Sequence, residues 1–316
     1  MSYLIDRYVN FFTDYGFKRL FGEEPNKDLL MDFLNALLSE DQGEIVDLTY
    51  LKDENLGSTI LDRKAIFDLY CITDKGERFI VELQKAKQNY FKDRSVFYSS
   101  FPIQQQAKRG DWDYQLKAVY TIGILDFVFE EDKAYPDKFR YDVKLKELET
   151  NKVFYDKLTY IYLSLPKFKK QVHELETHFE KWLYAIKNLH LLENVPDPLQ
   201  EAIFDKFFEI AEIANFDREE LQKYEDSLKY YRDLKNSFDT AREEGREEGR
   251  KEGIKEGSVE TLQSMLLKSL KMKFTTVPDT ISEKVSRINS LETLESFFEK
   301  VFVCTTMEEF VALLDY

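Results

Sequence analysis

Two acidic residues stand inside apolar stretches of the chain, Asp68 in KAIFDLYCIT and Glu82 in RFIVELQ. Burying an ionised carboxylate without a partner is costly, and two carboxylates on one face of a sheet repel each other unless a cation lies between them. Mg²⁺ binds carboxylate oxygens and keeps several waters. It also lowers the pKa of a water and offsets the charge of a phosphodiester. Asp68 and Glu82 are therefore candidate ligands of Mg²⁺ or Mn²⁺ at a hydrolytic site.

The elements that must bring these carboxylates together are two strands joined by a tight turn. The apolar runs on either side of DKGE, with Gly76 in the turn, are typical of a β-hairpin. Side chains alternate between the two faces of a strand. Lys64 should therefore share a face with Asp68 on the first strand, and Gln84 should share a face with Glu82 on the second.

The remaining periodicity divides the chain into a mixed first half and a helical second half. Besides the hairpin, strands are predicted at 44–51, 114–129, 139–148 and 157–166. Helices are predicted near 6–22, at 27–40, at 85–109 with an interruption near Pro102, and throughout the region after Phe168. From Gly245 to Gly257 a glycine recurs every four residues in a charged repeat. This repeat indicates either a solvated linker helix or a helix whose glycines allow close packing against a second helix.

The bulk composition predicts a folded protein with an uneven charge. The chain has 316 residues, 43% of them hydrophobic, which is ample for a packed core. The net charge of −15 argues against nucleic-acid binding by the chain as a whole. Residues 84–109, however, hold six basic side chains against one acidic, Asp93. This segment predicts either a local basic patch beside the carboxylates or a solvated helix face.

Several motifs around the two carboxylates resemble one known family. The spacing Asp68…Glu82-Leu83-Gln84 resembles the D…(E)xK signature of PD-(D/E)XK nucleases. The flanking segments FTDYGFKRLFG, RSVFYSS and LSLPKF resemble the branch of recombination-promoting nucleases and transposases. The resemblance covers about residues 10–168. It implies an α/β fold, a restriction-endonuclease-like mixed sheet flanked by helices, followed here by an all-helical C-terminal part.

The resemblance also implies roles for the residues of the hairpin. Asp68 and Glu82 would bind the metal together with the backbone carbonyl of Leu83. Gln84 stands where many relatives have Lys, and an amide cannot carry a positive charge, although it can orient a water or a phosphate oxygen. Lys64, on the same predicted face as Asp68, either supplies the missing charge or forms a surface salt bridge.

Two further pairs match the family pattern at helical i,i+4 spacing. Asp14 and Lys18 either help to close a DNA-binding active site or form a simple ion pair on a helix. Arg94 and Tyr98 follow the hairpin. Arg94 is expected to hold a DNA phosphate through a bidentate contact, and Tyr98 either assists it or packs on the sheet.

These observations predict four regions. They are a PD-(D/E)XK-like nuclease domain at 1–168, a helical accessory domain at 169–240, a charged Gly-repeat linker helix at 241–257 and a small helical tail at 258–316.

The predicted function is metal-dependent hydrolysis of DNA phosphodiester bonds, linked to recombination or transposition. The alternative is a catalytically inactive binding or regulatory protein of the same fold that self-associates through its C-terminal helices. A phosphatase or glycosidase with paired carboxylates is a third candidate that no further motif supports. The N-terminus resembles no signal peptide and no apolar run reaches the ~20 residues of a membrane span. We therefore predict a cytoplasmic protein with DNA as its partner, no membrane contact, and a homo-oligomer formed through the C-terminal helical region.

Overall fold

The chain forms two compact units, Met1–Asn236 and Ser237–Tyr316, in a computed structural model. The structure describes residues 6–38, 43–51, 67–107 and 110–314. The boundary between the units falls inside one long helix, α6 (Arg218–Phe274). Each unit has its own hydrophobic core.

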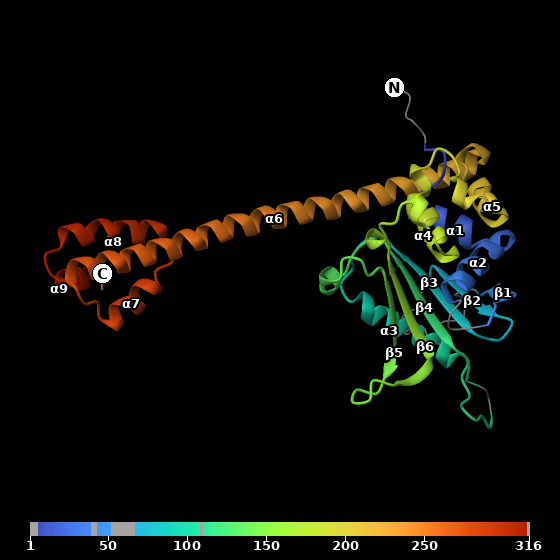
Figure 1. Cartoon of the computed structure of the whole chain (residues 1–316), viewed down its shortest axis with the longest axis horizontal. Coiled ribbons are helices and arrows are strands. Elements are labelled where there is room, and N and C mark those ends of the chain that lie inside the picture. Colours follow the sequence, from blue (N-terminus) through green and yellow to red (C-terminus); the bar gives the residue numbers. More distant parts are fainter. Residues whose placement is uncertain (1–5, 39–42, 52–66, 108–109, 315–316) are drawn as a thin grey trace. The chain divides into compact units, whose positions relative to one another are not determined.

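The first unit is built on a mixed six-stranded sheet of order β1-β2-β3-β4-β6-β5 (Figure 1). Strands β3, β4 and β6 run parallel, and the outer pairs are antiparallel. The turn between β2 and β3 contains Gly76 at φ 85°, a backbone conformation that favours glycine. The strands are β1 (Leu48–Tyr50), β2 (Leu69–Thr73), β3 (Arg78–Gln84), β4 (Val119–Leu125), β5 (Arg140–Lys146) and β6 (Val153–Ser164). The mixed sheet and the hairpin predicted from the sequence are confirmed.

Helices cover both faces of this sheet. Those of the first unit are α1 (Asp14–Phe21), α2 (Lys27–Leu38), α3 (Phe91–Gln104), α4 (His178–Asn188), α5 (Ala202–Ala211) and the first part of α6. Thr13 caps α1 by accepting a hydrogen bond from the Gly16 N–H at 2.9 Å. Thr177 caps α4 in the same way through Glu180, whose side chain bonds back to the cap residue.

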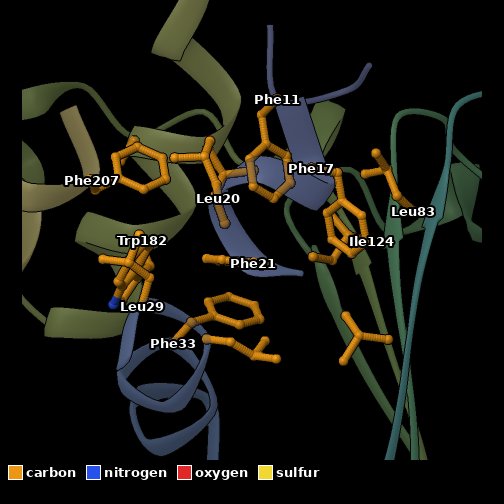
Figure 2. Packing of buried hydrophobic residues seen from close by; sticks show 14 of the residues in the cluster. Phe11, Phe17, Leu20, Phe21, Leu29, Phe33, Leu83, Ile124, Trp182 and Phe207 are labelled. Atoms are coloured by element: carbon orange, nitrogen blue, oxygen red, sulfur yellow. The ribbon is translucent and has the colours of Figure 1, made fainter. Parts of the chain in front are cut away.

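The main core lies between one face of the sheet and helices α1, α2, α4 and α5. Its sheet side includes alternate residues of β3 and β4, among them Leu83 and Ile124, together with residues of β1, β2 and β6. Trp182 of α4 is fully buried at its centre, with ring centroids 4.9 Å from Phe204 of α5 and 5.7 Å from Phe21 of α1. Figure 2 shows Trp182, Phe21 and Phe207 among the side chains that fill the space between the helices. Helices α4 and α5, which the sequence assigns to an accessory domain, therefore share the core of the sheet.

The opposite face of the sheet is covered by α3. Two smaller clusters form there, one around Tyr70 and Ile80 and one around Phe91, Tyr160 and Tyr162. Because β3 alternates, Glu82 and Gln84 point to this face, whereas Leu83 points to the main core. Helix α3 is thus the element that lies over the candidate site.

The second unit is helical and contains the glycine repeat. Its core joins the end of α6 to α7 (Asp279–Ser286), α8 (Leu291–Val303) and α9 (Met307–Leu314). The repeat from Gly245 to Gly257 is helical and exposed, and space around each of its four glycines is open. Close packing of these glycines against another chain stays a prediction. Among the described helices, none is long and apolar enough to cross a membrane.

Several element boundaries differ from the sequence prediction, and α3 continues through Pro102, where an interruption of the helix was predicted. The helix predicted at 85–109 begins only at Phe91, because the chain turns after β3 and Tyr90 adopts φ 62°. The strand predicted at 44–51 is limited to Leu48–Tyr50, the residues that pair with β2. Asp68 lies just before β2 rather than within it. The position of its side chain is therefore set by the backbone that leads into β2. The division of the chain into four regions, with boundaries at 168, 240 and 257, stays a prediction.

Candidate active site

Asp68 and Glu82 lie side by side, as the hairpin predicts. The backbone N–H of Asp68 donates to Glu82 Oε1 at 3.3 Å, and Asp68 Oδ2 accepts the backbone N–H of Leu83 at 2.7 Å. Glu82 is buried, with 8% of its surface exposed. The start of β2 and the end of β3 thus hold two carboxyl groups in adjacent positions.

The electrostatic surroundings of Asp68 combine burial with charges from α1. Burial raises the pKa of the Asp68 carboxyl, and the Leu83 N–H partly opposes this. Asp14 raises the same pKa further, whereas Lys18 and Lys85 lower it. A carboxylate in such surroundings gains from a nearby cation, because its negative charge is poorly solvated.

Gln84, which the resemblance described above pairs with the Lys of the family signature, has its amide held on both sides. Its Oε1 accepts a hydrogen bond from Arg94 Nη2 at 2.5 Å, and its Nε2 donates to the Ala86 carbonyl at 2.9 Å. Arg94 Nη1 donates to Gln88 Oε1 at 2.5 Å. Two neutral amides, those of Gln84 and Gln88, therefore fix the guanidinium of Arg94, and neither amide neutralises its positive charge.

A glycine in β4 allows α3 to approach the sheet at this point. Gly123 pairs with Glu82 across the sheet. A Cβ at position 123 would lie 3.0 Å from Tyr162 Cδ1 and 3.5 Å from Phe91 Cζ. Phe91 is the first residue of α3, and Arg94 follows one turn later. Gly123 thus helps to set the height of Arg94 above the sheet, and the sequence signal for it is a glycine inside a strand pattern.

Tyr98 and the basic segment have mixed roles. The Tyr98 ring packs edge-on against Phe67 at 5.2 Å and lies 5.8 Å from the Arg94 guanidinium, so it contacts both the sheet and the arginine. Lys87 pairs with Glu130 at 3.8 Å, and Lys92 pairs with Glu131 at 2.6 Å. The acids of the loop after β4 therefore reduce the net charge of the basic segment.

Asp14 and Lys18 form the helical ion pair that their spacing predicts. The two groups are 3.1 Å apart on α1, and each side chain is about half exposed. Both act electrostatically on Asp68, so the pair lies at the rim of the candidate site. The structure is thus compatible with both roles weighed from the sequence.

Helix α6 reaches the same end of the sheet, which the sequence gives no signal for. Tyr231 donates a hydrogen bond to Asp126 Oδ2 at 2.8 Å, and the Asp126 N–H donates to the Gln84 carbonyl at 2.9 Å. Burial raises the pKa of Asp126. Tyr230 lies beneath Lys85, whose Nζ is 5.7 Å from the ring centroid.

The donor set suits a hard cation that keeps part of its water shell. The described residues contain no cluster of three or more His, Cys, Asp or Glu side chains that would enclose a metal. Mg²⁺ needs only one or two carboxylates together with water and substrate oxygens, and a buried carboxylate pair meets that need. Lys64 lies outside the described residues, so its role stays a prediction.

A mixed sheet with two acids on its central hairpin and helices on both faces defines the restriction-endonuclease-like class of nuclease folds. Comparison with family models agrees with this class. The model described as PD-(D/E)XK nuclease family transposase matches residues 11–241, and the chain belongs to this family. No curated protein and no solved structure matches the chain.

Proposed function

We propose that the protein is a metal-dependent DNA endonuclease that acts in recombination or transposition. The observation that supports this best is the adjacency of Asp68 and Glu82, joined through the Asp68 N–H and the Glu82 carboxylate at 3.3 Å. Family membership supports the same reaction class and a DNA substrate. We also propose that the protein acts in the cytoplasm, as predicted from the sequence.

In the proposed reaction, one water adds to phosphorus and one P–O bond to a sugar oxygen breaks. Asp68, Glu82 and the Leu83 carbonyl would hold Mg²⁺ or Mn²⁺. When bound, the ion supplies positive charge for the phosphate and lowers the pKa of a water. The leaving oxygen takes a proton, and the products are a phosphate monoester and a free hydroxyl.

Arg94 binds the DNA phosphate in this proposal, and Gln84 positions it. The amide oxygens of Gln84 and Gln88 each accept one guanidinium N–H at 2.5 Å, which sets the plane of the fork. The free N–H groups of a fixed fork match the geometry of phosphate oxygens. Asp14, Lys18 and Tyr98 line the DNA path around this contact.

The first test is cleavage of supercoiled plasmid by purified protein in Mg²⁺, Mn²⁺ or EDTA, beside Glu82→Gln. We expect cleavage with either metal, none in EDTA, and none by the variant. Failure of the wild-type protein to cut with any metal would favour the inactive binding protein that the sequence left open. The exchange of the family Lys for Gln84 is the observation that favours that alternative.

Arg94→Lys should weaken binding of duplex DNA by about tenfold or more, because a charge-assisted hydrogen bond contributes roughly 1.5–3 kcal/mol. Lysine keeps the charge but cannot donate to both Gln84 and Gln88 in one plane. Fluorescence anisotropy with labelled duplex in EDTA measures the effect. Lys92→Arg is the matched control, since Lys92 lies two residues away and pairs with Glu131. Equal affinities of Arg94→Lys and wild type for duplex DNA would contradict the proposal that Arg94 binds a phosphate.

A further inference from the structure

Lys85 is a partly buried cation that directly follows Gln84 at the end of β3. Its Nζ lies 5.7 Å from the ring centroid of Tyr230 on α6. Across the described ranges, no carboxylate forms an ion pair with Lys85, in contrast to Lys87 and Lys92 on the same segment. A partly buried ammonium without an ion pair is costly for the fold, so an anion bound beside Lys85 would offset that cost.

The charges that face Lys85 belong to the candidate active site. Burial lowers the pKa of Lys85, and Asp14 and Asp68 oppose this shift, while Lys18 adds to it. Asp14 and Lys18 compensate each other through their 3.1 Å ion pair. The group that remains opposite Lys85 is therefore Asp68, which the proposed function assigns to the metal.

Lys85 and Arg94 lie on different sides of the carboxylates. Gln84 faces α3, where it holds Arg94. Lys85, the next residue, is placed among groups of α1 and α6, namely Asp14 and Tyr230. A phosphate group bound at Asp68 and Glu82 would thus meet one cation from the side of each set of helices.

We propose that Lys85 binds the scissile phosphodiester of DNA and supplies the positive charge that Gln84 cannot carry. The inference rests on the proposed nuclease function and names a further residue for that site. Its ligand chemistry is a non-bridging phosphate oxygen held by an ammonium group. Tyr230 positions the ammonium by offering its ring face, a contact that favours a cation.

The test compares Lys85→Met and Lys85→Arg with wild type in the full chain. With Mg²⁺ and saturating plasmid, Lys85→Met should cut about 100-fold more slowly, and Lys85→Arg should stay within about tenfold of wild type, as for loss of one preorganised donor. Lys87→Met is the matched control: Lys87 is exposed and pairs with Glu130, so its turnover should match wild type. Melting in the absence of DNA should show no loss of stability in Lys85→Met.

A second readout needs no cleavage. In EDTA, the slope of log K against log salt for duplex binding should fall in magnitude by about 0.9 in Lys85→Met, as expected for one lost phosphate contact. Lys85→Gln gives a second neutral variant if Lys85→Met melts at a lower temperature.

Wild-type turnover and an unchanged salt slope in the neutral variants would overturn the assignment of Lys85 while leaving the nuclease function intact. If the wild-type protein does not cut at all, the proposed function fails, and a wild-type salt slope in Lys85→Met then overturns the phosphate contact as well.

Discussion

Replacing Asp68 by Asn should abolish DNA cleavage and leave the melting temperature of the metal-free protein unchanged or slightly raised. The Asn carbonyl oxygen can still accept the Leu83 N–H that Asp68 Oδ2 accepts at 2.7 Å. The negative charge that would hold the metal is lost, however. Burial raises the pKa of Asp68 and so disfavours its ionised form in the fold, which is why removing that charge should not cost stability.

Plasmid cleavage measures the expected loss of activity, and thermal melting in EDTA measures the expected stability of the metal-free protein. Asp74→Asn is the matched control, because Asp74 is exposed in the turn of the same hairpin and the chemical change is identical. Binding of Mn²⁺, followed by calorimetry, should be lost in Asp68→Asn and kept in Asp74→Asn. Cleavage by Asp68→Asn at the wild-type rate would contradict the metal-ligand assignment.

Truncating Trp182 to Ala should destabilise the first unit by about 3–5 kcal/mol, the usual range for a large buried aromatic. Trp182 is fully buried and its indole N–H donates to Asp32 Oδ2 at 2.6 Å. Its ring contacts aromatic side chains of α1, α2 and α5, including Phe33 and Phe207 (Figure 2). Trp182→Ala should therefore destabilise the sheet as well as α4.

Urea unfolding followed by circular dichroism and by tyrosine fluorescence distinguishes one transition from two. We expect the tyrosine signal and the part of the circular dichroism that comes from the first unit to move together to lower urea in Trp182→Ala, while the helices of the second unit, which have their own core, unfold separately. Phe302→Ala is the control, because Phe302 is 67% exposed on α8 of the second unit. Early loss of helix with an intact sheet would instead support the separate accessory domain predicted for 169–240.

The hairpin and its carboxylates were predictable because they depend on local pattern. Alternation places Glu82 and Gln84 on one face of β3, and the turn needs Gly76 at positive φ. The start of α3 was not predictable in this way. The segment after Gln84 has good helix formers, but the chain must first turn at Tyr90 to cross the sheet edge, and tertiary contacts decide that turn.

The contribution of α6 to the site lies beyond sequence reasoning for a different reason. Tyr230 and Tyr231 follow Gln84 by well over a hundred residues and carry no motif. Their contacts with Lys85 and Asp126 depend on how the first part of α6 packs within the first unit. Local periodicity predicts that α6 is a helix, but it cannot specify which distant residues that helix meets.

The contacts between the two ends of the first unit have a consequence for biosynthesis. Tyr8 forms a β-bridge with Glu212, and the Asn10 N–H donates to the Tyr224 hydroxyl at 3.0 Å. A ribosome releases Asp68 and Glu82 long before it releases these C-terminal partners, and such non-local contacts form late in folding. A nascent chain or a prematurely terminated one therefore carries the acids without a fixed α1 beside them. Completion of the candidate site therefore awaits synthesis of nearly the whole first unit.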